Sequence, residues 1–201
     1  TQRQQEQQDT QMKNHKWSEL MADNRRLFHP AQQQALRQHL DQGLANFTPL
    51  EQIDVPKFER PTQMKPGVSD DYTPTQEQMI RDDQMEGPMA TWARQQFQLL
   101  HCQVSYHVQP PGGLVYNHVD VQGTLTRRFA DMGVEASTDN FRHYIISLKD
   151  WQPGQSWMLH NQSWIDWRAG DVIEMPWYMP HATVNANDTH NAERLIVVGV
   201  Q

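Results

Sequence analysis

The sequence predicts an α+β fold in which a helical and irregular first half precedes a β-sandwich or jelly roll. Two observations support this prediction. Apolar residues recur at helical spacing before residue 100 and alternate with polar residues beyond it. About seven short apolar runs then follow, separated by turn signals, which is typical of packed antiparallel sheets. We expect residues 1–201 to form a single domain, with residues 1–100 as the helical and irregular part and residues 101–201 as the core.

The first predicted helix runs from Pro30 to about Gln42. Proline suits the first turn of a helix, Leu36 and Leu40 lie on one face, and Gly43 is placed to end it. The prolines between residues 48 and 72 then predict an extended segment without regular periodicity.

A second helical region is expected to begin at Thr73, a plausible cap before Pro74, and to continue after Pro88. Its second part carries an apolar stripe at helical spacing, which we interpret as a packing face. The stripe consists of Met89, Trp92, Ala93, Phe97 and Leu100.

Seven segments beyond residue 100 have the properties of strands. In residues 101–109, apolar and polar side chains alternate, and the turn sequence PPGG separates them from residues 114–120. Turn signals such as QPGQ and NDTHN bound the other candidates. These are residues 141–148, 156–161, 171–176, 181–186 and 194–200.

The composition argues against several classes of partner. A net charge of -7, from 17 basic and 24 acidic side chains, is the opposite of the basic excess that phosphate backbones attract. No apolar run is long enough to span a bilayer, and the glutamine-rich start lacks the apolar core of a signal peptide. We therefore expect a cytoplasmic protein with no nucleic-acid or membrane partner. The lone Cys102 cannot form an internal disulfide.

The stretch LVYNHVDVQG contains the first candidate metal ligands, His118 and Asp120. Residues two apart on a strand face the same side, about 6.6 to 7 Å apart, so both side chains can reach one ion. The same spacing recurs at His39 and Asp41. That pair falls in the first predicted helix, where residues two apart point about 200° from each other, so it is not expected to bind a metal.

His181, in GDVIEMPWYMPHATVN, is the candidate third ligand because it begins another predicted strand. Two histidines and one carboxylate leave coordination positions open, which is the arrangement associated with non-haem iron(II) oxygenases. A structural zinc site would instead close its shell with a fourth protein ligand.

These motifs resemble the iron(II)- and 2-oxoglutarate-dependent oxygenase superfamily over about residues 100–201. The resemblance rests on HVD, on GDVIEMPWYMPHATVN and on ERLIVVGV. FRHYIISL followed by WMLHNQSWIDWRAGDVIEMP is most similar to the aspartyl/asparaginyl β-hydroxylase and proline hydroxylase branch. The resemblance implies a double-stranded β-helix (jelly roll, cupin-like) core. It also implies that His118, Asp120 and His181 are the catalytic iron ligands, and that Arg194 binds the distal carboxylate of 2-oxoglutarate.

Strand alternation supports an inward Arg194, because it shares an apolar face with Ile196 and Val198. Tyr106 and Arg142 are further cofactor-binding candidates. Tyr106 could donate a hydrogen bond to 2-oxoglutarate or anchor a barrel edge. Arg142 could bind a carboxylate of cosubstrate or substrate, or form a salt bridge at the strand end. The related branch has the order Arg-x-His where this chain has Arg-His-Tyr, which leaves open whether Arg142 or His143 faces the pocket.

The function expected from the resemblance is hydroxylation of an unactivated C–H bond, with 2-oxoglutarate and dioxygen consumed and succinate and carbon dioxide released. The substrate could be an amino acid, a peptide or protein side chain, or a small metabolite. Proline-rich extended segments lie on surfaces, so we expect residues 48–72 to border the active-site mouth. The alternatives are a cupin-like metalloenzyme that does not use 2-oxoglutarate and a non-catalytic β-sandwich binding module. Only the 2-oxoglutarate-dependent oxygenase needs the cation at Arg194, and only the binding module predicts no iron(II) uptake.

Overall fold

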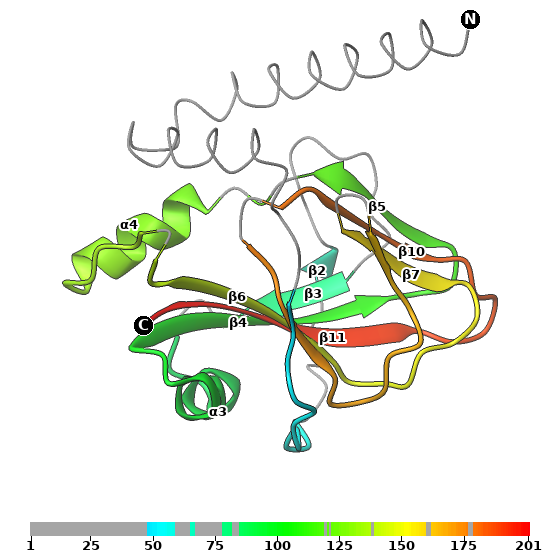
Figure 1. Cartoon of the computed structure of the whole chain (residues 1–201), viewed down its shortest axis with the longest axis horizontal. Coiled ribbons are helices and arrows are strands. Elements are labelled where there is room, and N and C mark those ends of the chain that lie inside the picture. The colour runs from blue at the N-terminus through cyan, green and yellow to red at the C-terminus, as the bar shows by residue number, and fades with distance from the viewer. Residues whose placement is uncertain are drawn as a thin grey trace, which may run out of the picture. The chain divides into compact units, whose positions relative to one another are not determined.

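The computed structural model describes residues 48–58, 65–66, 78–81, 85–118, 120, 122–137, 139–159, 162–176 and 179–201. These residues all belong to one compact unit, residues 43–201. They form two antiparallel β-sheets and two helices (Figure 1). The predicted helix at residues 30–42, with His39 and Asp41, lies outside the described residues.

The larger sheet has seven strands, and its three longest strands lie together. The order is β1-β9-β6-β11-β4-β3-β2, so β11 pairs with β4 on one side and with β6 on the other. The strands are β1 (Thr48–Pro49), β2 (Lys65–Pro66), β3 (Gln78–Arg81), β4 (His101–Gln109), β6 (Phe141–Ser147), β9 (Val172–Glu174) and β11 (Ala192–Val200).

The smaller sheet has four strands in the order β5-β10-β7-β8. These are β5 (Gly113–His118), β7 (Gln155–Leu159), β8 (Gln162–Trp164) and β10 (His181–Asn185). Side chains of both sheets pack into one apolar cluster, in which Ile145 of β6 and Ile173 of β9 meet Trp157 and Leu159 of β7. The two sheets therefore face each other, as in the predicted jelly roll.

The larger sheet is apolar on its outer face as well, because helix α3 (Pro88–Phe97) covers it. Pro88 begins α3 after Gly87, and Gln98 ends it in the left-handed conformation at φ 54°. Ala90 and Ala93 are its buried residues, and they pack in the outer cluster with side chains of β4, β6 and β11. The outer cluster includes Cys102, Val104, Tyr106, Val108, Tyr144, Ile146, Leu195 and Val197.

The seven strands predicted beyond residue 100 have counterparts among the described residues, although β5 ends at His118 and not at residue 120. Three described elements, β3, β8 and α4, differ from expectation. Residues 78–81 form β3, which pairs with β4, so the second helical region is limited to α3 within the described residues. Helix α4 (Gly123–Asp131) was not predicted. It buries Leu125 and Phe129, four residues apart, and Gly133 follows it at φ 85°.

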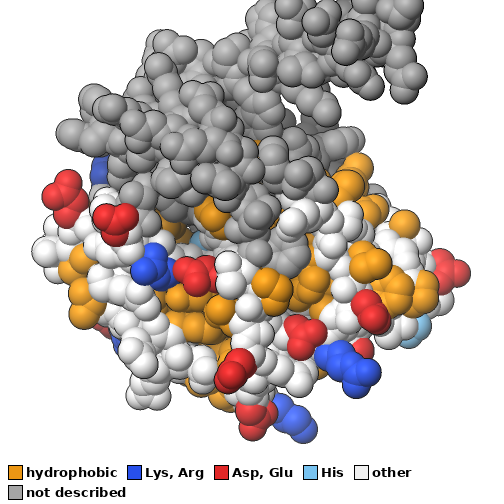
Figure 2. All heavy atoms as spheres, in the orientation of Figure 1, with side chains coloured by type: hydrophobic (Ala, Val, Ile, Leu, Met, Phe, Trp, Pro, Cys, Tyr) orange, Lys and Arg blue, Asp and Glu red, His pale blue; other side chains and the backbone are white. Residues whose placement is uncertain are grey.

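The exposed surface is mixed in charge where it is described. Acidic and basic side chains are interspersed with apolar ones on the face shown in Figure 2. Among the described residues, no helix is long and apolar enough to cross a membrane.

Leu195 tests the packing of the outer cluster, because its side chain is fully buried. We expect Leu195→Ala to lower the free energy of unfolding by about 2 to 5 kcal/mol, through lost burial and the cavity left behind. Leu100 is the control, since it is 57% exposed, and Leu100→Ala is expected to change stability by less than about 0.5 kcal/mol. Chemical denaturation of both variants measures the difference. Equal losses would contradict the burial of Leu195.

Candidate metal centre

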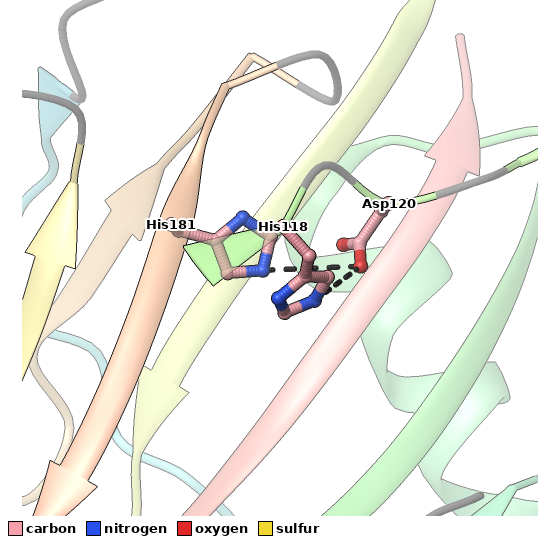
Figure 3. Close-up of side chains that lie close together, drawn as sticks. All are labelled: His118, Asp120 and His181. Atoms are coloured by element: carbon pink, nitrogen blue, oxygen red, sulfur yellow. Dashed lines mark ion pairs between the residues drawn. The ribbon is translucent and has the colours of Figure 1, made fainter. Parts of the chain in front are cut away.

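His118, Asp120 and His181 come together at one end of the smaller sheet. His118 is the last residue of β5 and His181 the first of β10, and the two are directly paired in the register of these antiparallel strands. Asp120 was expected on the same strand as His118, but it lies beyond the strand end. The chain after β5 brings its carboxylate to both imidazoles (Figure 3).

The three side chains have the spacing of metal ligands. Asp120 Oδ1 lies 3.2 Å from His118 Nε2 and 3.8 Å from His181 Nε2. One possible ligand atom from each residue lies within 4.8 Å of the others. Metal–ligand bonds of about 2.0 to 2.2 Å place neighbouring ligand atoms roughly 2.8 to 3.6 Å apart, so the cluster could hold one metal ion after a small adjustment.

His181 is already oriented as a metal-binding histidine would be. Its Nδ1 lies 2.9 Å from the carbonyl oxygen of Met179, which can only accept, so Nδ1 carries the proton and Nε2 presents a lone pair toward Asp120. Burial, together with the neighbouring His118, lowers the pKa of His181 to about 4, although Asp120 opposes the shift. His181 is therefore neutral at physiological pH.

Asp120 is ionised at the same pH. Burial alone would raise the pKa of its carboxyl group, but the positive charges that His181, His143 and His118 carry in their protonated forms, together with the hydrogen bond from His118, outweigh burial and hold the pKa well below its usual range. A carboxylate oxygen thus faces the lone pair of a neutral imidazole. A cation between them would turn this unfavourable contact of two acceptors into coordination.

His143 also reaches the site, and the structure decides that it faces inward rather than Arg142. It lies on β6 with 1% of its surface exposed, and its Nδ1 is 3.8 Å from Asp120 Oδ2. Neither ring nitrogen has a hydrogen-bond partner among the residues that the structure describes. Burial lowers its pKa, so this histidine is neutral as well.

Arg142 lies on the outer face of the larger sheet, beside Tyr144 in the alternation of β6. Its Nε donates to Gln201 Oε1 at 2.9 Å and lies 3.6 Å from a carboxylate oxygen of Glu174. The contacts of Arg142 therefore match the salt-bridge alternative, and we no longer consider Arg142 a ligand of the cosubstrate.

Tyr106 also lies on the outer face, so its position does not fit the prediction that it binds 2-oxoglutarate. Its side chain packs in the outer cluster with α3, and its hydroxyl donates to a carboxylate oxygen of Glu193. The inner residues of β4 are instead polar, because Ser105, His107 and Gln109 alternate with the apolar outer ones. Tyr106 is therefore a packing residue and does not reach the inner face.

Arg194 faces inward, as the alternation of β11 predicts. It is buried, and its guanidinium donates to Gln109 Oε1 at 3.4 Å and to Thr183 Oγ1 at 3.3 Å. The guanidinium carbon lies 4.6 Å from the centre of the Trp157 ring, and that ring lies 5.8 Å from the imidazole of His181. Trp157 thus contacts both the metal-site histidine and the inward arginine.

The described part of the proline-rich segment does not border this site. Ile53, Val55 and Phe58 pack against the outer cluster, and the backbone N–H groups of Leu50 and Ile53 donate to the carbonyl groups of Val172 and Gly170. Residues 48–49 therefore form an edge strand of the larger sheet, and residues 53–58 pack on the face of that sheet opposite to His143. The prediction that this segment borders the mouth is wrong for these residues.

Comparisons with known proteins found similar solved structures but no matching family. No protein-family model matches the chain, and no curated protein does either. A prolyl-4-hydroxylase from Pseudomonas putida is similar in structure at 14% identity and a TM-score of 0.49, over 87% of this chain and 90% of that chain. A cupin-2 domain protein from Rhodospirillum rubrum has 10% identity and a TM-score of 0.43, over 76% and 78%.

The polyketide cyclase RemF from Streptomyces resistomycificus is a third similar structure, with 12% identity and a TM-score of 0.42, over 73% and 81% of the two chains. Similarities of this size do not transfer an activity. Two facing antiparallel sheets, as in a jelly roll, bring His118, Asp120 and His181 together, where they could bind a metal ion.

Proposed function

We propose that this protein is an iron(II)- and 2-oxoglutarate-dependent dioxygenase that hydroxylates an unactivated C–H bond. The observation that carries the proposal is the convergence of two histidines and one aspartate at the edge of a jelly roll, with one ligand atom from each within 4.8 Å of the others. Two histidines and a carboxylate with open positions are the ligand set of non-haem iron(II) oxygenases.

The chemistry of the donors fits a divalent iron ion. Nε2 of the neutral His181 is unprotonated, and Asp120 is already ionised, so neither group has to lose a proton to bind it. The carboxylate and imidazole ligands suit iron(II). Iron(II) bound here would supply dioxygen activation, which no side chain can perform.

Arg194 supports 2-oxoglutarate as the cosubstrate. The buried guanidinium contacts Gln109, Thr183 and Trp157, and its planar group can bind a carboxylate through two charge-assisted hydrogen bonds. Because Trp157 contacts both His181 and Arg194, an anion at Arg194 would lie near the proposed metal site. A dicarboxylate could then use one end at the metal and the other at the arginine.

The substrate class is proposed as an amino acid, a peptide or protein side chain, or a small metabolite. Dioxygen is the second reactant, and succinate and carbon dioxide are the products of the cosubstrate. The inner faces carry many neutral hydrogen-bonding groups, which suits a polar organic substrate. These groups include Ser105, Ser147, Gln155 and Asn185.

Succinate formation tests the proposal. The full chain, loaded with iron(II) without oxygen, is mixed with 2-oxoglutarate and air in the presence of amino acids, peptides and small metabolites. We expect succinate to form only when iron(II), 2-oxoglutarate and dioxygen are all present, and to increase with a true substrate. Iron binding without 2-oxoglutarate binding would favour the cupin-like metalloenzyme. The absence of iron(II) binding would favour the binding module.

A further inference from the structure

The two oxygens of the Asp120 carboxylate face different partners. Oδ1 is the atom nearest to both candidate ligand histidines, at 3.2 Å from His118 Nε2 and 3.8 Å from His181 Nε2. Oδ2 faces His143 instead, with Nδ1 of that ring 3.8 Å away. The carboxylate therefore directs one oxygen toward the two candidate ligand histidines and the other toward a third histidine.

His143 is not explained by packing alone. Its neighbours on β11 and β6 are the apolar Val198 and Ile145. An aliphatic side chain could pack against them at no polar cost, whereas histidine buries two ring nitrogens that have no hydrogen-bond partner within the described part of the chain. An imidazole with a proton on Nδ1 can donate to Oδ2 if the two groups approach by about 1 Å, to the usual hydrogen-bond distance of about 2.9 Å.

We propose that His143 is a positioning residue that holds Oδ2 of Asp120 and thereby keeps Asp120 a monodentate ligand through Oδ1. Carboxylates bind metal ions through one or both oxygens. A second oxygen left without a partner would be available to the same ion, and it would occupy a position that cosubstrate and dioxygen need. This inference rests on the metal site of the proposed function, and it concerns a residue outside the triad.

Cobalt(II) is a suitable probe, because its visible absorption reports the coordination of the site without turnover. Three forms of the full chain are titrated with cobalt(II): the parent, the His143→Leu variant and the His143→Asn variant. Leucine removes both ring nitrogens, whereas the asparagine amide can place a donor close to the position of Nδ1. His107→Leu is the matched control, since His107 is another buried histidine on the inner face, on β4, where it is hydrogen-bonded to Ser105.

His143→Leu is expected to bind cobalt(II) about 10- to 100-fold more weakly than the parent, the usual loss when a group that orients a metal ligand is removed. Its absorption spectrum is expected to change as well. His143→Asn should recover most of the affinity and the parent spectrum, and His107→Leu should match the parent in both. Parent-like affinity and spectrum in His143→Leu would overturn the proposal and make His143 an ordinary core residue.

His143→Gln keeps the test decisive if the leucine variant does not fold. Glutamine places its amide near the position of Nε2, so the proposal requires His143→Asn to bind cobalt(II) more tightly than His143→Gln. Equal affinities would overturn it. A thermal melt of each metal-free chain identifies variants that are unfolded.

The cobalt(II) readout separates this inference from the proposed function. A parent chain that binds cobalt(II) through the triad, shows the His143 effect and forms no succinate would reject the oxygenase and support the role of His143. A parent chain that binds no cobalt(II) would overturn both.

Discussion

Replacing His181 by alanine is expected to weaken the binding of a divalent metal ion by more than about 100-fold, a larger loss than removal of an orienting group causes. His181 supplies one of three ligand atoms that lie within 4.8 Å of one another, and the loss leaves only His118 and Asp120. Anaerobic titration with iron(II) against a coloured chelator measures the change.

His190→Ala is the matched control for this experiment. His190 is exposed, and its ring contacts Thr189 and Asn187 rather than the triad. Its removal should leave metal affinity unchanged. Unchanged iron(II) binding in His181→Ala would reject the assignment of the site.

Replacing Arg194 by alanine is expected to weaken 2-oxoglutarate binding by about 2 to 4 kcal/mol, as for the loss of one partner of a buried charge-assisted pair. Arg194 is 4% exposed and lies on the inner face of the larger sheet, which also carries His143 beside Asp120. The metal ligands themselves are not altered, so iron(II) affinity should remain close to that of the parent. Titration of 2-oxoglutarate into the anaerobic iron(II) form measures the effect.

Arg142→Ala provides the comparison, because Arg142 pairs with Glu174 on the opposite face of the same sheet. We expect it to bind 2-oxoglutarate as tightly as the parent. Equal affinities in the Arg194→Ala variant and the parent would make Arg194 a structural residue and weaken the oxygenase assignment.

The long strands of the core were predictable because their evidence is local. Residues 101–109 alternate in polarity, and residues 141–148 and 194–200 are dominated by β-branched and aromatic residues between turn signals. Their observed counterparts are β4, β6 and β11. The pairing of the short β3 with β4 was not predictable in this way, because four residues carry little periodicity and the partner is distant in the sequence.

Helix α4 could have been recognised from Leu125 and Phe129 at helical spacing before Gly133. The position of Asp120 could not, because His-x-Asp spacing is compatible with one continuous strand. In the structure, β5 ends at His118, and the path of the chain beyond it sets the carboxylate position. The strand therefore ends between two residues whose spacing had predicted one continuous strand.

By itself, the sequence predicted His118 and Asp120 from their spacing, and His181 from its place at the start of a predicted strand and from the family resemblance. It also predicted the strands that carry the two histidines, because the evidence for strands is local. Only the tertiary structure decided which face of each central strand points inward. The reason is that α3 buries the outer face of the larger sheet, so apolar side chains no longer mark the interior. In β4 the apolar face, with Tyr106, packs under α3, and the polar face, with Ser105, His107 and Gln109, lies inside. The same physical effect places Arg142 outside and His143 beside Asp120.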